Sequence, residues 1–583
     1  MNFNRKTSAV LVALAGLASL NLSAKENWEY VKPNLGAEGE GNVFPGVCVP
    51  FGMVKLGADC GDLGANQGWK AGDRIQGFSH THVSGTGGGP KYGNILVQPV
   101  VGDLDVNNYG SDRAAETFEL NRYSVKLTRY NVGVRLTASE KVGAHEYTFP
   151  ASEKSKIIID ATSFLKVGHG ESQQPVASEV KALSDTEMEG YSTVKGGWNM
   201  GGPYTVYFFA RTDTPARDVK VLKDGGLGCF EFNTAADQKI GLRVGISYIS
   251  TQQARANLEA VEALDFDGMR QAGVDKWSAI LNTIDVEGSE DDKTIFYSAL
   301  HHTYLQPTDR TGENPLWNSA EPYYDDYYAI WDTFRATHPL ITLVTPSRQA
   351  DIVRSLIDIW DHEGYMPDGR SGNCNGRVQG GSNADVMIAD AFVKGLKGIN
   401  YENGLKAMLK NAETEPADAR KEGRGGALYA KTLGYVPYEV ERSGTRTYEN
   451  AYCDFAIATV ARGMGRDDMY QTYLHRSDNW QNLWNDDIES LGFKGFLWPK
   501  KANGEWVSAD SYNVFWRQDW EGVCYESFPW EMSFYVPHNV ARLVERCGGA
   551  DNFVKRLDTY FTHDKVFDQN YSMGLFQVSN EPG

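Results

Sequence analysis

The stretch LRVGISYISTQQARANLEA, residues 242–260, changes its hydrophobic pattern part of the way along. Up to Ile249 apolar and polar residues alternate, which is the two-residue period of a β-strand. From Ala254 onward apolar residues recur at helical spacing. Because strand-like segments precede this stretch and helix-like segments follow it, the sequence predicts an N-terminal β domain over residues 25–260 and a helical domain over residues 261–583.

The first half of the chain contains short segments rich in β-branched and aromatic residues, separated by turns. Alternation over four to eight residues predicts strands, and a series of such strands favours a β-sandwich. The segments are SVKLTRY (124–130), GVRLTAS (133–139), HEYTFP (145–150), KIIIDA (156–161), YTVYFFAR (204–211) and LRVGISYIS (242–250).

The second half has apolar residues at helical spacing, and several of its segments end on a glycine, at Gly364, Gly398 and Gly463. A run of helical hairpins with long connections rich in Trp and Tyr predicts an α/α toroid whose loops line a central cleft. The fold class is therefore multidomain α+β. The helical segments are 254–260, 265–284, 292–307, 350–364, 384–398, 401–413 and 456–464.

Composition excludes several classes of protein. The 583 residues are enough for two domains, and 41% apolar with 23% charged residues is typical of a globular chain. A formal charge of -19 would repel a polyanion, so nucleic acid is excluded as a partner. Seven scattered cysteines do not form a dense disulfide framework; Cys48 and Cys60 could form a bridge or remain as buried thiols.

The N-terminus has the layout of a cleaved secretory signal over residues 1–24. Arg5 and Lys6 precede an apolar run from Ala9 to Leu20, and small residues follow it. The run is too short to span a membrane, and no comparable run follows. We expect a periplasmic or secreted protein with no membrane span.

The stretch GFSHTHVSGTGGGPKYG, residues 77–93, suggests three alternatives: a phosphate-binding loop, a metal site, or a loop that fits closely around a neutral ligand or another domain. A strand-like segment instead of a helix follows Lys91, which excludes a phosphate-binding loop. His80 and His82 supply two ligands where zinc needs three or four. A close-fitting loop, with both imidazoles as hydrogen-bond partners, or a plain surface turn remains.

Several carboxylates stand beside aromatic residues or Gly/Pro turns, as expected around a bound sugar. Glycoside hydrolysis needs two carboxyl groups, one to protonate the leaving oxygen and one on the other face of the ring. For each residue the alternative is a helix N-cap or a solvated loop. Motifs of serine hydrolases, zinc proteases and dehydrogenases are absent from the sequence. The candidates are Asp332, Asp361, Asp368, Asp519, Glu521, Glu526 and Glu581.

Taken in order, these segments resemble glycoside hydrolase family 92, the calcium-dependent, exo-acting α-mannosidases. The resemblance covers nearly the whole chain after the signal peptide. It rests on residues 41–59 (GNVFPGVCVPFGMVKLGAD), 77–87, 143–150, 244–250, 282–302, 331–340 (WDTFRATHPL), 387–395, 448–458, 535–539 (YVPHN) and 579–583 (SNEPG).

The resemblance implies a β-sandwich packed on an (α/α)6 toroid, with one pocket for a terminal mannose that includes His80 and His82. It implies that Glu526 is the general acid, with Trp530 and Phe534 as apolar neighbours that would raise its pKa. Trp331 and Asp332 match a pair that holds sugar hydroxyls, and Asn580 and Glu581 match a segment near the leaving group. Ca²⁺ is the implied cofactor, and the candidate ligands are Gln577, Asn580 and Glu581.

The chain departs from the family pattern in two places. Ser527 and Phe528 stand where a Gly-Asn pair is usual, which leaves the linkage preference open. Family members continue past the segment matched by residues 579–583, and their base aspartates lie there, so the toroid is expected to be incomplete at its C-terminal end. The resulting prediction is an exo-acting, inverting, Ca²⁺-dependent α-mannosidase acting on glycans. The alternatives are another toroid glycosidase, for glucosidic or phosphomannosyl linkages, and a non-catalytic mannose-binding protein.

Overall fold

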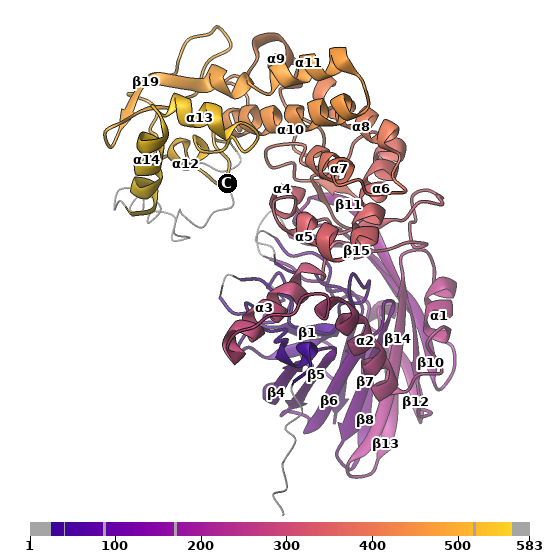
Figure 1. Cartoon of the computed structure of the whole chain (residues 1–583). Coiled ribbons are helices and arrows are strands. Elements are labelled where there is room, and N and C mark those ends of the chain that lie inside the picture. Colours follow the sequence, from indigo (N-terminus) through magenta and orange to yellow (C-terminus); the bar gives the residue numbers. More distant parts are fainter. Residues whose placement is uncertain are drawn as a thin grey trace, which may run out of the picture.

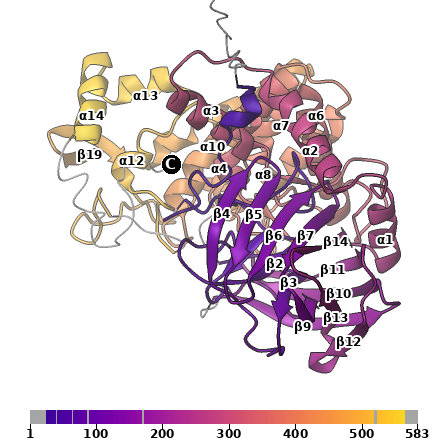
Figure 2. The ribbon, with the colours of Figure 1, turned by 90° about the horizontal axis from the view of Figure 1, so that it is seen from below.

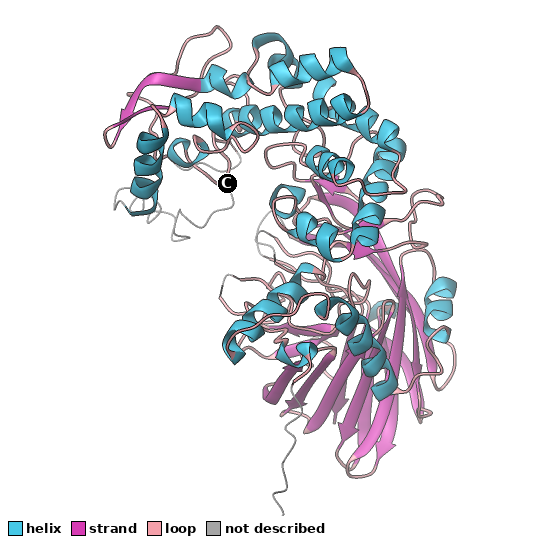
Figure 3. Cartoon of the chain, in the orientation of Figure 1, coloured by secondary structure: helices cyan, strands magenta, loops and turns pink. Residues whose placement is uncertain are grey.

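The computed structural model describes residues 25–562, except 40, 64, 86–88, 168–171 and 517–520. The predicted signal peptide and residues 563–583 lie outside this part. Figures 1 and 3 show the strands gathered in one half of the molecule and the helices arching over the other half. The prediction of a β-sandwich followed by a helical domain is confirmed.

The β domain consists of two antiparallel sheets. The six-stranded sheet has the order β1-β2-β3-β8-β13-β12, and the eight-stranded sheet has the order β4-β5-β6-β7-β14-β11-β10-β9. The strands are β1 (Gly57–Cys60), β2 (Ile75–Ser79), β3 (Leu96–Val101), β4 (Arg113–Glu119), β5 (Arg122–Leu127), β6 (Val132–Ala138), β7 (Val142–Phe149), β8 (Ser152–Asp160), β9 (Gln173–Ala182), β10 (Glu187–Gly196), β11 (Gly201–Thr212), β12 (Asp218–Leu222), β13 (Leu227–Thr234) and β14 (Gln238–Ser247).

The core of this domain lies between the two sheets. In β14, Ile240, Leu242, Val244 and Ile246 are all completely buried. They belong to one apolar cluster with residues of the other sheet, such as Ile158 of β8. The alternation that predicted the strand therefore reflects one face packed on the opposite sheet. Figure 2 shows the sheets from below.

The switch from strand to helix occurs within residues 242–260, because β14 ends at Ser247 and the first helix begins at Thr251. Ser250 accepts a hydrogen bond from the backbone nitrogen of Gln253 at 3.1 Å, so it is the N-cap of the first helix, α1 (Thr251–Glu259). This helix packs on the outer face of the eight-stranded sheet. A side chain at Gly245 would lie 2.3 Å from the carbonyl oxygen of Ala254, so this close approach requires glycine.

The helical domain follows as a series of hairpins, of which α5–α6, α7–α8 and α10–α11 are successive pairs (Figure 1). Gly364 ends α6 in the left-handed conformation, as predicted, whereas Gly463 lies in the last turn of α10 and Gly465 takes that conformation. The α-helices are α2 (Phe266–Leu281), α3 (Glu290–Thr303), α4 (Ile330–Thr333), α5 (Thr337–Val344), α6 (Pro346–Glu363), α7 (Ala384–Val393), α8 (Tyr401–Glu413), α9 (Ala427–Leu433), α10 (Ser443–Gly463), α11 (Asp467–Arg476), α12 (Pro529–Met532), α13 (Val540–Arg546) and α14 (Ala550–Thr562).

Short elements complete the fold. They are the 3-10 helices η1 (Asn27–Tyr30), η2 (Lys223–Gly225) and η3 (Asn479–Leu483), and the two-stranded pairs β15 (Thr308–Asp309) with β16 (Tyr324–Asp325), β17 (Gly369–Arg370) with β18 (Asn375–Gly376), and β19 (Trp484–Ser490) with β20 (Phe493–Leu497). Among the described helices, none is long and apolar enough to cross a membrane. All seven cysteines are free thiols, so Cys48 and Cys60 are buried and unbridged.

A buried arginine joins the two domains. The Arg310 guanidinium forms ion pairs with Asp325 at 3.0 Å and with Asp326 at 3.2 Å. From the β domain, Tyr248 places its ring centroid 3.6 Å from the guanidinium carbon, and the Tyr92 hydroxyl lies 2.5 Å from Nη2. The three buried charges of the helical domain, Arg310, Asp325 and Asp326, are thus enclosed in part by tyrosines of the β domain.

The end of the glycine-rich stretch contributes to this junction. The Tyr92 hydroxyl donates to Asp326 at 2.5 Å and accepts from the backbone nitrogen of Gly372 at 2.9 Å. Lys91 donates to the side chain of Asn199 at 2.9 Å, and Asn199 donates to the carbonyl oxygen of Ser371 at 2.7 Å. Lys91 and Tyr92, at the end of the stretch 77–93, thus lie at the contact with the helical domain. This agrees with the alternative in which the stretch fits closely against another domain.

The junction predicts a large loss of stability on Arg310→Met. The substitution would leave buried Asp326 without its paired guanidinium and Asp325 with only Arg370, at 3.9 Å, which costs about 3–5 kcal/mol. Urea denaturation should show a lower midpoint. The control is Arg466→Met, which breaks the exposed pair with Glu402 at 3.1 Å and should cost about 0–1 kcal/mol. Equal losses in the two variants would contradict a special role of Arg310.

Candidate active site around Trp331

Trp331 and Asp332 lie in the short helix α4 and differ in exposure. The Trp331 indole is completely buried, and its Nε1 has no partner among the described residues, whereas Asp332 is exposed. Arg335 donates to the carbonyl oxygen of Trp331 at 3.1 Å and lies 5.0 Å from its ring centroid. The turn is thus held rigidly while the Asp332 carboxylate faces outward.

Asp368 connects this turn to the loop that follows it. One carboxylate oxygen accepts from the backbone nitrogen of Trp331 and the other from that of Gln379, each at 2.8 Å. Burial raises the pKa of Asp368 to about 7; the two backbone hydrogen bonds oppose this shift, and the nearby charges of Asp332 and Glu449 add to it. The loop from 369 to 379 is the same one that Tyr92 and Asn199 hold at the junction.

Glu526 reaches this region through its neighbour Tyr525. The segment before it crosses the first turn of α10, where Val523 accepts from the backbone nitrogen of Gly444 at 2.9 Å. The backbone nitrogen of Tyr525 donates to the Thr445 hydroxyl at 2.8 Å. The Tyr525 ring then packs edge-on against Trp331, with 6.0 Å between ring centroids. The α10 N-terminus therefore sets the distance between Glu526 and α4.

Glu526 has two unusual features. Its φ of +48° lies in the left-handed region, which is uncommon for a residue with a side chain and is found preferentially at functional sites. Its carboxylate adjoins the Tyr525 hydroxyl. Burial, followed by the charge and hydrogen bond of Glu526, raises the pKa of Tyr525 well above its ordinary value. The side chain of Glu526 is half-buried, so it remains open on one side.

A second buried carboxylate supports the site from behind. Glu449 of α10 accepts from Arg335 at 3.2 Å, from Asn383 at 2.9 Å and from Tyr535 at 3.0 Å. Its pKa is raised because burial outweighs these three donors. Since Arg335 also packs on Trp331, the Glu449 contacts fix the position of α4 relative to α7 and α10.

We call these residues the Trp331 cluster, defined as Trp331, Asp332, Asp368, Gln379, Tyr525 and Glu526. The structure brings together four of the residues predicted from sequence, namely Glu526, Trp331, Asp332 and Asp368. The partners of His80 and His82 lie in the β domain, and Asp361 and Glu521 are exposed. The remaining candidates lie outside the described residues; they are Asp519, Gln577, Asn580 and Glu581.

His80 is part of a buried hydrogen-bond chain. Its Nδ1 lies 2.7 Å from the carbonyl oxygen of Ile95, and its Nε2 lies 3.2 Å from Nε2 of His145. The Tyr147 hydroxyl completes the chain at 2.8 Å from Nδ1 of His145. Burial lowers the pKa of His80 to about 4, so the ring is neutral at pH 7. Both ring nitrogens of His80 already have protein partners. Its assignment to substrate binding stays a prediction.

His82 is equally enclosed. Its Nδ1 lies 2.7 Å from the carbonyl oxygen of Lys55, and its Nε2 lies 2.7 Å from a carboxylate oxygen of Asp59. The ring stacks on Phe44 with 4.8 Å between centroids. A role for His82 in contacting substrate also stays a prediction, and the partners named here, among the described residues, belong to the β domain.

Trp530 and Phe534, the apolar neighbours expected for Glu526, belong to an apolar core. Trp530 is completely buried and packs against Phe496 and Tyr560 in an apolar core, and Phe534 borders the same core. The ring adjacent to Glu526 is that of Tyr525, which directly precedes it in the sequence. Tyr525 could have been predicted as a site residue because it directly precedes Glu526 in the segment CYESFPWEM. No motif in the sequence pointed to Gln379.

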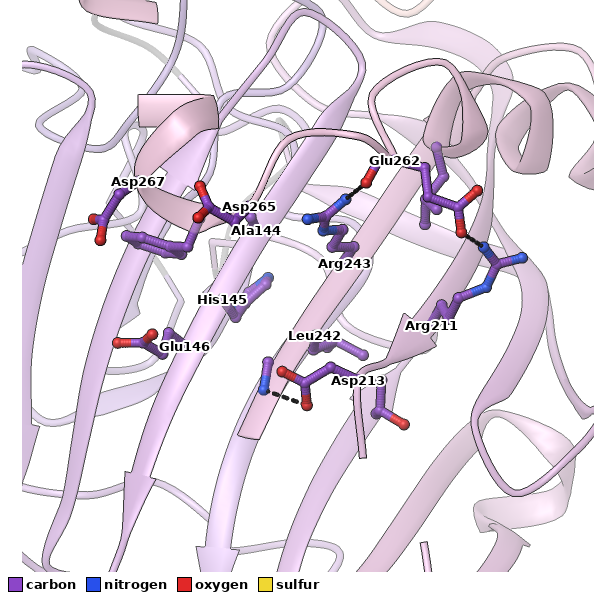
Figure 4. A pocket seen from close by; sticks show the side chains of 14 residues that line it. Ala144, His145, Glu146, Arg211, Asp213, Leu242, Arg243, Glu262, Asp265 and Asp267 are labelled. Atoms are coloured by element: carbon purple, nitrogen blue, oxygen red, sulfur yellow. Dashed lines mark hydrogen bonds and ion pairs between the residues drawn. The ribbon is translucent and has the colours of Figure 1, made fainter. Parts of the chain in front are cut away.

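A cavity of about 430 Å³ on the outer face of the eight-stranded sheet is separate from the Trp331 cluster (Figure 4). Its charged residues have partners both inside and outside the lining, and Glu146 and Asp267 both pair with Arg135, at 2.8 and 2.6 Å. Arg211 lies 2.6 Å from Glu262, and Arg243 donates to the carbonyl oxygen of Glu262 at 3.1 Å. Asp213 and Asp265 accept hydrogen bonds from the backbone nitrogens of Gly241 and Gly268.

The described residues contain no group of three or more His, Cys, Asp or Glu side chains arranged to hold a metal ion. The candidate calcium ligands Gln577, Asn580 and Glu581 fall outside this part of the chain.

A β-sandwich joined to helical hairpins, with carboxylates beside aromatic rings at the helix ends, is the architecture of a two-domain glycoside hydrolase. The model of the glycosyl hydrolase family 92 N-terminal domain matches residues 30–247, and that of the family 92 catalytic domain matches residues 253–583. The chain belongs to glycosyl hydrolase family 92.

Solved structures and a curated relative agree with this assignment. A family 92 α-mannosidase of Bacteroides thetaiotaomicron in complex with mannoimidazole is 27% identical, with a TM-score of 0.83 over 92% of this chain and 74% of that one. An inverting family 92 mannosidase of the same species is 25% identical, with a TM-score of 0.82 over 96% and 79%. An uncharacterized secreted glycosidase of Arthroderma benhamiae is 29% identical over 622 residues, covering 95% of this chain and 75% of the relative.

The geometry of Asp368 predicts a pH-dependent effect of Asp368→Asn. The amide nitrogen cannot accept, so one of the two backbone N–H groups loses its partner at a cost of about 1–3 kcal/mol. Because the pKa of Asp368 is raised in the folded state, its contribution to stability is present below pH 4 and is lost as the pH rises through about 7.

Urea denaturation from pH 3.5 to 8 measures this effect. The stability of the parent relative to Asp368→Asn should fall by up to about 1.4 kcal/mol per pH unit between pH 4 and 7 and level off above. The control is Asp361→Asn, at an exposed position of α6. A difference between the parent and Asp368→Asn that stays constant over this range would refute the raised pKa.

Proposed function

We propose that this glycoside hydrolase is an exo-acting, inverting α-mannosidase that requires Ca²⁺ and removes terminal α-mannosides from glycans. The observation that carries the proposal is that Tyr525 links Glu526 to Trp331, since its hydroxyl adjoins the Glu526 carboxylate and its ring packs against the Trp331 indole. The family membership supports glycosidic chemistry, and the solved α-mannosidases with which the chain shares its fold favour mannose as the sugar.

In the proposed reaction Glu526 protonates the leaving oxygen as the glycosidic bond breaks. A half-buried carboxyl group on a strained left-handed backbone has a fixed direction, which a proton donor needs. The adjacent Tyr525 hydroxyl, which hydrogen-bonds to Glu526, stabilises the carboxylate left after proton transfer. This carboxylate is the charge that develops on the enzyme during the step.

Asp332 is the second participant in the proposed site. Its exposed carboxylate accepts hydrogen bonds from sugar hydroxyls, while the buried Trp331 indole and Asp368 keep its backbone in place. The general base that activates water is not assigned to any of the described residues. A water molecule attacking the face opposite Glu526 inverts the anomeric carbon.

Calcium enters the proposal through the family resemblance. Gln577, Asn580 and Glu581 offer carboxylate and amide oxygens, the donors that Ca²⁺ prefers. When bound, the ion would supply positive charge that orients sugar hydroxyls. No step above is assigned to it.

We place the enzyme outside the cytoplasm, in the periplasm or secreted. The support is the signal-like layout of residues 1–24 and the description of the fungal relative as secreted.

Glu526→Gln tests the assignment of the acid. Loss of a proton donor should lower kcat/KM by about 10²–10⁴-fold for an α-linked mannobiose, whose leaving group needs protonation. An aryl α-mannoside with an acidic phenol as leaving group should lose much less. The control is Glu521→Gln, at an exposed position five residues earlier. Equal losses on both substrates would remove Glu526 from the acid role.

Proton NMR of mannose release tests the stereochemistry and the metal. The first product from an α-mannoside should be β-mannose, and activity should disappear after treatment with EDTA and return with CaCl2. Retention, or full activity of calcium-depleted protein, would count against the proposal. Mannose binding without turnover would favour the mannose-binding alternative, and hydrolysis confined to glucosides or phosphomannosides would favour another toroid glycosidase.

A further inference from the structure

Gln379 belongs to the Trp331 cluster through a side-chain hydrogen bond with the Tyr525 hydroxyl. Gln379 is buried, and its Oε1 has no hydrogen-bond partner among the described residues. The amide nitrogen is therefore the atom that donates to Tyr525. The direction of the pKa shift agrees with this: burial and Glu526 raise the pKa of Tyr525, whereas Gln379 opposes the rise, as a donor to the phenol oxygen does.

The direction of this hydrogen bond decides where the Tyr525 proton points. A hydroxyl has one proton to donate, and a hydroxyl oxygen that accepts from an amide keeps that proton for another acceptor. The Glu526 side chain hydrogen-bonds to the same hydroxyl. Gln379 therefore directs the Tyr525 proton toward Glu526. The reverse orientation of the amide would present Oε1 to Tyr525 and draw the proton away.

The orientation of the amide leaves a buried acceptor unpaired. Such an atom is unfavourable and calls for a compensating interaction. A hydrogen bond to an ionised carboxylate is about twice as strong as one between neutral groups. Donation from Gln379 to Tyr525, and from Tyr525 to Glu526, supplies a bond of this kind. The unpaired Oε1 is thus compensated when Glu526 is ionised.

The N-terminus of α10 fixes the distance between Gln379 and Tyr525. The buried Arg442 donates from Nη1 to the carbonyl oxygen of Gln379 at 3.1 Å, and its backbone nitrogen donates to the carbonyl oxygen of Gly522. Three residues further along the helix, the Thr445 hydroxyl accepts from the backbone nitrogen of Tyr525 at 2.8 Å. A single helical turn therefore holds the backbone on both sides of the hydrogen bond.

Contacts with α4 hold the same part of the loop from the other side. The backbone nitrogen of Gln379 donates to Asp368 at 2.8 Å. A side chain at Gly380 would lie 2.4 Å from the Trp331 ring and 2.4 Å from the Thr445 side chain, so this close approach requires glycine. All these contacts use the backbone around Gln379. A substitution of its side chain leaves them in place.

Several charged groups act on this part of the site, from the loop at 369–379, from α4, α10 and α12, and from the residue that precedes the loop. The substitutions below leave all of these groups unchanged. A shift in titration between variants therefore measures the hydrogen bond that is removed. The groups are Arg377, Asp332, Arg442, Glu449, Glu531 and Asp368.

We propose that Gln379 is a positioning residue for the general acid: through the Tyr525 hydroxyl it directs a hydrogen bond to Glu526 and so sets the upper end of the pH range in which Glu526 can donate its proton. The inference rests on the proposed function, because it takes Glu526 as the acid. It predicts that kcat/KM declines at a lower pH in the parent than in a variant without the amide.

Gln379→Met, which keeps a side chain of similar shape, provides the test. The alkaline limb of the pH profile of kcat/KM for an α-linked mannobiose should move up by about half a pH unit, because the Tyr525 proton is free to turn away from Glu526. Tyr525→Phe removes a hydrogen bond to a charged group and should move the limb by about one unit. The control is Gln349→Met, at a buried glutamine whose Oε1 lies 3.1 Å from Nδ1 of His338, and its limb should not move.

A double variant shows whether Gln379 acts through the hydroxyl. In the Tyr525→Phe background, Gln379→Met should leave the limb where Tyr525→Phe alone places it. An unchanged limb in Gln379→Met, or a shift that persists in full in the Tyr525→Phe background, would overturn the inference.

Gln379→Glu is the second variant in case thermal denaturation shows that Gln379→Met does not fold. Its carboxylate accepts the Tyr525 proton and turns it away from Glu526, so the limb should move up by about one unit. A limb at the position of the parent would contradict the role of Gln379.

The two proposals fail separately. If the parent releases no mannose, the proposed function fails. Carbon-13 NMR of protein labelled at the glutamate carboxyl carbons, with Glu526→Gln to identify the Glu526 signal, then measures the pH midpoint of this carboxyl group directly. A higher midpoint in Gln379→Met than in the parent supports the role of Gln379, and equal midpoints overturn it.

Discussion

The buried guanidinium of Arg310 is the constraint on which the arrangement of the two domains depends. A cation enclosed with two carboxylates is tolerated only when each charge keeps its partners, so the helical domain cannot shift relative to Tyr92 and Tyr248 without exposing or stranding a charge. The loop after Asp368 is held from both sides of this junction. The position of Asp368, and through it that of Trp331, therefore depends on residues far away in the sequence.

Much of the fold could be predicted because the relevant signals are local. The alternation in residues 242–248 corresponds to one face of β14 packed on the opposite sheet, and the helical spacing over 401–413 coincides with the bounds of α8. Strand β9 (Gln173–Ala182) was missed because it lies at a sheet edge and is exposed on both faces for part of its length, which removes the alternation. The β10 segment carries buried Gly190 and Ser192 in place of large apolar residues, which weakens the same signal.

The candidate site was predictable only in part, for a related reason. The carboxylates Glu526, Asp332 and Asp368 stand out in the sequence because of their aromatic and turn neighbours. Which of them meet depends on contacts between distant segments, such as the Thr445 hydroxyl with the backbone of Tyr525. The spacing of His80 and His82 suggested ligand contacts, but His145, Asp59 and two backbone carbonyls complete their hydrogen bonds. None of these partners can be inferred from the histidine motif itself.

The way Tyr92 and Tyr248 cover Arg310 also bears on how the gene can be divided. Cutting the chain near residue 250 would separate Tyr92 and Tyr248 from the Arg310 cation that they enclose. The helical half would then expose buried charges to water, and the β half would expose the two tyrosine side chains. The segments matched by the two family models are thus not independent cassettes. Recombination between distant relatives would succeed only where both sides of this contact are inherited together.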